Sequence, residues 1–436
     1  MTGLLATCGA QFRDWSAAYR LFSHQRLPMP EIFATIRRAA LADLPADAPA
    51  CAVIDDSLLR RGGLHTPGVA WRRDPLGPHF QTNLVRAQRC LQTSLALHTA
   101  EGACRMVPVS FVHAPTPDKL SPKATDPQRQ EYRVAVRASR LSQRGLEQIS
   151  SLRAALDADS PSAPRPLWVA FDGGYTNATV LKHIPPRTIC IGRVRKDAHL
   201  LWVPDPETRQ ARGRRLCYGL PAPTPEQVRS DDSPWETIEL ARNDNRYTLR
   251  FKRRTGLMWR AAGAGRVVQL VVIAAMGYRL RKGSKLLYRQ PAFLICTDET
   301  ADVRRVLETF LQRWDIEVNF REEKTLLGMG EAQVRCAHSV QDAPALTAAS
   351  YAMLQIATQR AYATTHDQLL PSAKWTKPVE GARISTQQAL HQLRAEVWAR
   401  GLGVADFSAF ASSLAPDTKP EKFDFPLASA VCYANA

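Results

Sequence analysis

Three acidic residues that lie far apart in the sequence could meet at one metal site. Asp55 follows the apolar run of residues 50–54, Asp172 follows the apolar run of residues 167–171, and Glu317 lies in a stretch with helical spacing. Convergent carboxylates suit Mg²⁺, which prefers oxygen ligands and keeps water or phosphate oxygens in its remaining positions. Two such ions roughly 4 Å apart can activate the attacking oxygen and stabilise the leaving oxygen of a phosphodiester. The acids therefore predict metal-dependent phosphoryl transfer.

The stretch around Glu317 carries basic side chains on the same helix face. Phe310, Arg313, Glu317 and Lys324 are spaced by three, four and seven residues, which places them on one stripe. A metal-binding acid between two cations could lie beside DNA phosphates on either side of a cleaved bond. The same spacing also fits a surface stripe with an i,i+4 salt bridge between Arg313 and Glu317. Spacing alone leaves both interpretations open.

The elements that hold these residues are predicted from apolar patterning and turn signals. The strand of residues 50–54 is expected to end at the acids, with a turn over residues 60–63, and Asp172 is expected at the exit of its own strand. Helices are predicted for residues 12–44 with a break at Pro30, 141–156, 303–327, 344–362 and 385–400, strands for 50–54, 90–99, 106–112, 167–171, 188–194 and 267–276, and a surface loop for 115–127.

The charge balance favours a polyanionic partner. Lys and Arg number 58 against 41 Asp and Glu, a formal net charge of +17, which is compatible with nucleic acid, an anionic membrane surface or a basic enzyme of another kind. The longest apolar run, Val267 to Met276, is too short to span a bilayer and is predicted to be a buried strand. The N-terminus lacks the pattern of a secretory signal, so an intracellular protein is expected.

Cysteine and histidine spacing does not support a zinc enzyme. The nine cysteines are scattered, with no CxxC pair, and the ten histidines include no HExxH motif. We therefore expect reduced cysteines that serve as packing residues.

The helical stripe resembles the signature Tyr-x2-Arg-x3-Glu-x6-Lys of a large group of bacterial insertion-sequence DDE transposases. Arg313, Glu317 and Lys324 match at every spacing, while Phe310 replaces the tyrosine and cannot offer its hydroxyl to a phosphate. AVIDDS and VAFDGGYTN resemble the first two acidic blocks of this family, and IGRVRKDAHL is similar to the basic strand that follows the second.

The resemblance implies an α/β fold, in which an RNase H-like mixed sheet flanked by helices carries a β-rich insertion and helical terminal regions. The implied divisions are a helical N-terminal region that could bind DNA (1–45), the first part of the catalytic core (46–199), a β-rich basic insertion (200–296), the part of the core with the helix bearing Glu317 (297–362) and a helical C-terminal region (363–436).

The resemblance also implies roles for individual residues. Asp55, Asp172 and Glu317 would bind two Mg²⁺ ions, which Mn²⁺ could replace. Asp55 is preferred because its Asp-x-Ser register matches the family; Asp56 is the alternative and otherwise caps a turn. Trp314 is expected to anchor the core rather than to stack on a base. The DNA contacts are expected from Phe310, Arg313, Lys324, Arg193 and Lys196, with Arg195 beside the last two.

The predicted function is DNA transposition. The protein would bind the inverted-repeat ends of its own insertion sequence, hydrolyse phosphodiesters and join the freed 3′-hydroxyl to target DNA, with one protomer of a homodimer at each end. Excision could pass through a hairpin, and the expected location is the bacterial cytoplasm, at the nucleoid. The alternatives are a metal-dependent nuclease without strand transfer and an inactive DNA-binding relic.

Overall fold

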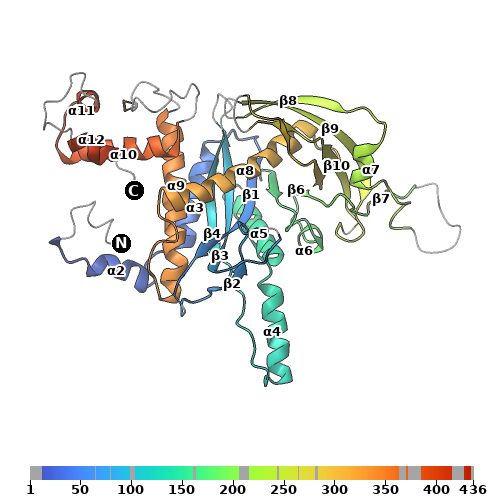
Figure 1. The fold of residues 1–436 in the computed structure, drawn as a ribbon, viewed down its shortest axis with the longest axis horizontal. Helices are drawn as coiled ribbons and strands as arrows, with labels where there is room; N and C mark the ends of the chain where they lie inside the picture. The colour runs from blue at the N-terminus through green and yellow to red at the C-terminus, as the bar shows by residue number, and fades with distance from the viewer. Residues whose placement is uncertain are drawn as a thin grey trace.

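Strands from most of the chain form one large mixed sheet (Figure 1). The computed structural model describes residues 12–63, 65–78, 80–98, 104–160, 164–205, 216–242, 245–263, 265–279, 283–362, 370–371, 384–414 and 427–433. The described strands are β1 (Ala50–Arg60), β2 (Ala70–Arg73), β3 (Leu84–His98), β4 (Cys104–His113), β5 (Leu167–Phe171), β6 (Thr188–Arg193), β7 (Leu201–Trp202), β8 (Glu236–Arg242), β9 (Asn245–Met258), β10 (Val267–Ile273), β11 (Gly277–Tyr278), β12 (Leu287–Tyr288) and β13 (Ala292–Cys296).

The sheet has a parallel centre and antiparallel sides. Its order is β2-β3-β1-β5-β6-β13-β10-β9-β7, with β4 paired to β3 and β8 paired to β9, while β11 and β12 form a separate ribbon. β5 runs parallel to both β1 and β6. The strands that follow β6 continue the same sheet, because β13 pairs with β6 and β10 pairs with β13. The predicted α/β class is confirmed, and a large mixed sheet flanked by helices is consistent with an RNase H-like fold.

Helices lie on both faces of this sheet (Figure 1). The described helices are α2 (Ser16–Ser23), α3 (Met29–Ala42), α4 (Asp126–Ala138), α5 (Leu141–Asp159), α6 (Ala178–Leu181), α7 (Pro225–Ser230), α8 (Val303–Thr325), α9 (Ala337–Tyr362), α10 (Thr386–Gly401), α11 (Phe407–Ser413) and α12 (Leu427–Cys432). α8 contacts β1 and β5, whereas α3 and α9 pack together beside β4 (Figure 1). The search of the described helices found none with the length and apolar character that crossing a membrane requires.

β1 continues past the point where the sequence predicts its end. Residues 50–54 pair in parallel with β5, and residues 55–60 remain paired with β3 in the antiparallel direction. The predicted strand end before Asp55 was wrong, because the polar residues that follow still complete the backbone hydrogen bonds of a β-ladder. Asp55 and Asp56 therefore lie inside a strand, at the level where its neighbour β5 ends.

α4 is a helix that apolar patterning does not predict. It begins at Asp126, inside the predicted loop over residues 115–127, and none of the helix's described side chains is buried. Two local signals specify it instead: Pro127 lies in the first turn, and Thr125 and Gln128 form a capping box. In Figure 1 this helix stands away from the sheet.

A buried polar network fixes α8 behind the acid-bearing strand. Glu322 accepts hydrogen bonds from the hydroxyls of Tyr351 on α9 and Thr386 on α10, each at 2.7 Å. On the next residue of α8, the carboxylate of Glu323 is fully buried, and the Gln92 amide donates to it at 3.1 and 3.2 Å when that amide is turned so that its nitrogen faces Glu323. Because Gln92 is the cross-strand neighbour of Asp55, the network links the register of β1 and β3 to the position of α8.

Burial raises the pKa of Glu323 to about 8, since the charged carboxylate is poorly solvated there. The folded state therefore binds this proton more tightly than the unfolded state does, and stability should fall as the pH rises from about 5 to 8. We expect Glu323→Gln to flatten this fall, raising the Tm above pH 8 with little change near pH 5. Thermal unfolding across this pH range, with the exposed Glu131→Gln as control, measures it; an unchanged slope in Glu323→Gln would contradict the assignment.

Candidate active site

The parallel pairing of β1 and β5 brings two of the predicted acids side by side. Val53 pairs with Ala170 and Ile54 with Phe171, so the next step of the register sets Asp55 beside Asp172. In-register residues of neighbouring strands point to the same face of a sheet. Phe171 also pairs with Gly192 of β6, which places the following residue, Arg193, next to Asp172. Asp172 is exposed at this edge, whereas Asp55 is largely buried.

The third acid reaches the same place from α8. Nη1 of Arg313 lies 3.4 Å from Oδ2 of Asp55 and 3.0 Å from Oε1 of Glu317. One guanidinium nitrogen thus contacts both carboxylates, and the two acids are no farther apart than these two distances combined. The i,i+4 salt bridge that spacing allows is present, but it turns toward β1 and includes a strand carboxylate. Asp55, Asp172, Arg313 and Glu317 therefore form one cluster.

Burial disfavours the charged form of Asp55, and Arg313 offsets this only in part. Burial and the neighbouring carboxylates of Asp56 and Asp172 raise its pKa to about 7, against the lowering effects of the Asp56 amide and Arg313. The Asp56 amide donates to Oδ1 of Asp55 at 2.9 Å. An additional cation at this point would favour the ionised form of Asp55.

Asp56 faces the opposite side of the sheet. Its Oδ1 accepts a hydrogen bond from the hydroxyl of Tyr175 at 3.2 Å. The ring of Tyr175 lies against Gly145 of α5, where a Cβ would come within 2.6 Å of a ring carbon, so the absence of a side chain permits this approach. Successive residues of a strand alternate between faces, and the two contacts follow that rule: Asp55 meets Arg313 of α8, whereas Asp56 meets Tyr175, which packs on α5.

The other residues predicted to contact DNA occupy different positions in the structure. Lys324 donates from Nζ to Oγ of Ser57 at 2.7 Å and to the carbonyl of Leu58 at 3.1 Å, so it docks on β1 just past the acids. Phe310 packs against the apolar cluster formed around β10 and α8. Lys196 is exposed beyond β6, and its carbonyl accepts from the amide of Glu226 at 3.0 Å.

The expectation that Trp314 anchors the core was wrong. Its side chain is 51% exposed, and the guanidinium of Arg289 lies 5.9 Å from its ring centre. On α8 this residue is one position from Arg313 and therefore turns about 100° away from the sheet. The indole is thus available on the surface close to the acids.

A groove of about 950 Å³ runs from the acids along β1 toward β2 and β3. Asp55 and Asp56 form part of its wall, and the indole of Trp71, 67% exposed, forms another part. A salt bridge of 2.9 Å between Arg60 and Asp74 crosses one side. Its basic residues are Arg60, Arg72, Arg73, Arg89 and Lys324. Such a surface suits a phosphate backbone that passes the carboxylates.

Sequence reasoning did not identify the arginines of this groove. Arg89 lies in the part of β3 that precedes the predicted strand of residues 90–99. The available signal was the alternation of Val85 and Ala87 with Arg86 and Gln88, which has the period of a strand. The cross-strand pairing that brings Arg89 close to Asp56 has no local signal in the sequence.

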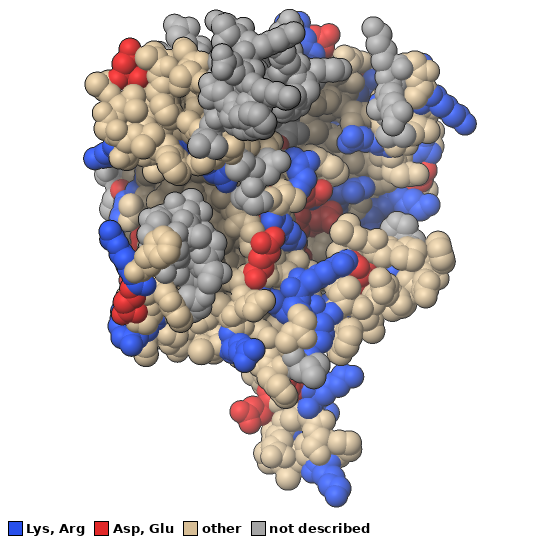
Figure 2. Space-filling view, turned by 60° about the vertical axis from the view of Figure 1, so that its left-hand side comes forward, with Lys and Arg blue, Asp and Glu red and all other residues tan. Residues whose placement is uncertain are grey.

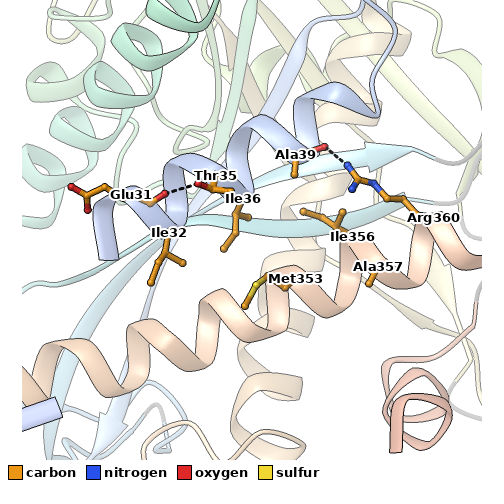
Figure 3. A pocket seen from close by; sticks show the side chains of 9 residues that line it. All are labelled: Glu31, Ile32, Thr35, Ile36, Ala39, Met353, Ile356, Ala357 and Arg360. Carbon is orange, nitrogen blue, oxygen red and sulfur yellow. Dashed lines mark hydrogen bonds between the residues drawn. The ribbon is translucent and has the colours of Figure 1, made fainter. Parts of the chain in front are cut away.

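A second hollow, of about 510 Å³, lies between α3 and α9 (Figure 3). Thr35 donates to the carbonyl of Glu31, and Arg360 donates to the carbonyl of Ala39, so these polar side chains are already bonded to the backbone. The rest of the wall is aliphatic: Ile32, Ile36, Ala39, Met353, Ile356 and Ala357. This hollow lacks a group of carboxylates, and the acids on β1, β5 and α8 remain the candidate site.

The donor set at those acids fits hard divalent cations. Asp55, Asp172 and Glu317 offer only carboxylate oxygens, and burial leaves the charge of Asp55 incompletely compensated. Within the described ranges, no group of three or more acidic, histidine or cysteine side chains stands in an arrangement that could hold a metal ion. At Asp55 and Glu317 the position of a positive charge is taken by Arg313. The eight described cysteines are free; Cys217 and Cys336 are exposed, so the expectation that the cysteines serve as packing residues was wrong for these two.

Comparison with known proteins identifies one family. The sequence pattern described as DDE superfamily endonuclease matches residues 1–256, which is more than half of the chain. The matched part contains Asp55 and Asp172 and ends before α8. A comparison with curated proteins returned no match.

Proposed function

The chain belongs to the DDE superfamily endonuclease family, and from this premise we propose that it is the transposase of a bacterial insertion sequence. Members of this family are metal-dependent endonucleases that act on DNA. The observation that carries the proposal is the contact of one arginine nitrogen with Asp55 and Glu317, next to Asp172 in the sheet register. In this contact the arginine and the glutamate of the insertion-sequence signature lie beside a strand acid, Asp55.

The metal ligands in this proposal are Asp55, Asp172 and Glu317. A pair of divalent cations bound there, Mg²⁺ or Mn²⁺, supplies activation of the attacking oxygen and stabilisation of the leaving oxygen. The protein supplies position: the β1–β5 register fixes the strand acids, and α8 carries the third. Without metal, Arg313 neutralises Asp55 and Glu317. When the acids bind metal ions instead, Arg313 is placed to contact a DNA phosphate.

The DNA path in this proposal follows the basic groove. Arg72 and Arg89 lie on the Asp56 side of the strand, and Lys324 lies at Ser57. Arg193 extends the same edge beside Asp172. Phosphate contacts of this kind hold the duplex without reading its sequence, so recognition of the inverted repeats requires further base contacts. A homodimer with one protomer per element end, acting in the bacterial cytoplasm at the nucleoid, completes the proposal.

A plasmid assay tests this function directly. Purified protein is incubated with Mg²⁺ and supercoiled plasmid carrying the DNA that flanks the coding sequence on both sides, with EDTA as control. We expect nicked, excised and joined products whose ends map to repeated sequences, and none in EDTA. Nicking at random positions without joined products would identify a nuclease instead. Tight DNA binding without any cleavage would identify an inactive relic and overturn the catalytic proposal.

A further inference from the structure

An arm formed by residues 115–138 projects from the end of the sheet that carries the acids. It consists of the loop over residues 115–125 and the helix α4, which stands away from the body (Figure 1). A helix of 13 residues that buries no side chain gains little from packing, and isolated helices of this length are marginal in water. The capping box and the proline in its first turn support the helix locally. Packing against the core therefore does not explain why this arm is present. We look for its role on its exposed surface instead.

The exposed surface of the arm is basic along one side. Arg129, Arg133 and Arg137 follow each other at intervals of four residues, which places them within a narrow stripe along the helix. All three are exposed. Arg129 donates to the carbonyls of Ala124 and Pro122 at 3.0 and 3.4 Å, so it also closes the loop. Figure 2 shows Lys and Arg side chains on the arm and on the body above it.

One arginine joins the base of the arm to the catalytic strand. Arg89 on β3 donates to the carbonyl of Ala114 at 3.2 Å and to that of Ser139 at 3.1 Å, the residues that flank the arm on either side. The guanidinium of Arg89 also lies close enough to Asp56 to interact with its charge, and it lines the groove beside the acids. The arm thus starts and ends at a residue of the proposed DNA path.

We propose that the arm binds the phosphate backbone of duplex DNA beside the bond that lies at the acids. The proposal rests on the proposed function and adds a second contact region to it. With about 1.5 Å per residue, α4 is about 20 Å long, or more than half of one turn of B-DNA. Arg133 and Arg137 are the cations that would contact phosphates, since Arg129 is partly used by the loop.

The composition of the arm favours DNA over a second protein copy. In α4, the large apolar side chain that is strongly exposed is Val134, at 61%. Protein interfaces are built around apolar and aromatic clusters, whereas phosphate contacts need arginine and little apolar area. The charge pattern of α4 therefore matches a polyanion.

The test compares the salt dependence of DNA binding in Arg133→Gln/Arg137→Gln and in the wild type. The probe is a duplex of arbitrary sequence, several helical turns long, in EDTA so that no cleavage occurs. Each phosphate contact contributes about 0.9 to the slope of log K against log salt, so the double variant should lose about two units of slope. At moderate salt its affinity should fall by roughly tenfold.

A charge-matched control separates this effect from the loss of net charge. Arg304→Gln/Arg400→Gln removes two exposed arginines, one from the first turn of α8 and one from α10, neither of which is a proposed DNA contact, and should keep the wild-type slope. An unchanged slope in the arm variant would overturn the arm proposal, even if the wild type cleaves DNA. A reduced slope in a protein that never cleaves would support the arm and reject the proposed function. A change in self-association, with the DNA slope unchanged, would assign the arm to a second copy.

Discussion

Replacement of Asp55 by Asn is expected to lower the rate of metal-dependent DNA cleavage by about 10³-fold, the loss that corresponds to several kcal/mol of transition-state stabilisation. The same replacement at Asp56 is expected to cost less than about tenfold. The two residues are adjacent, yet Asp55 meets Arg313 and Asp172 while Asp56 meets Tyr175 on the other face. An asparagine at position 56 keeps an oxygen that accepts the tyrosine hydrogen bond.

Each variant serves as the control for the other, because both replace one half-buried carboxylate on the same strand. Cleavage rates on plasmid DNA and the rise in Tm on adding Mg²⁺ are measured for each. We expect Asp55→Asn to lose both the cleavage and most of the Mg²⁺-induced rise, since a metal bound to the native state stabilises it. The reverse outcome, with Asp56→Asn inactive and Asp55→Asn active, would make Asp56 the first ligand.

The convergence of the acids could be foreseen from sequence because it depends on elements with strong local signals. The apolar runs at residues 50–54 and 167–171 form the paired strands, and helical spacing predicts α8. The exact end of β1 could not be foreseen, because residues 55–60 are held by the partner strand β3 rather than by their own apolarity. Cross-strand pairing is set by the whole sheet, and local sequence carries little of it.

The arm and the groove illustrate the same limit. α4 has few apolar residues and buries no side chain, so its apolar periodicity is a weak signal, and its capping box and Pro127 are the clearer signs of a helix. Arg89 is unremarkable in sequence, yet it bonds both flanks of the arm and lies near Asp56. The role of Arg89 depends on three segments that are distant in the sequence, so it can be recognised only in the folded structure.

A comparison of two similar salt bridges on α8 gives the second large expected effect. Arg304 and Glu308 are spaced like Arg313 and Glu317, with N–O distances of 3.8 and 3.0 Å. The first pair is solvated, with side chains 50% and 44% exposed, while Arg313 is only 12% exposed because it turns toward Asp55. We expect Glu317→Gln to reduce cleavage by about 10³-fold and Glu308→Gln by less than about twofold, since exposed pairs contribute little.

Measurements of DNA binding show whether the loss of cleavage comes from the catalytic step or from weaker DNA binding. DNA affinity in EDTA should be kept or increased in Glu317→Gln, because Arg313 loses one of its two carboxylate partners and becomes freer to contact a phosphate. Loss of cleavage with retained binding places Glu317 in the chemistry of the reaction. Equal activity of the two variants would mean that the Arg313–Glu317 pair is only a surface salt bridge, and the third metal ligand would then have to come from another element.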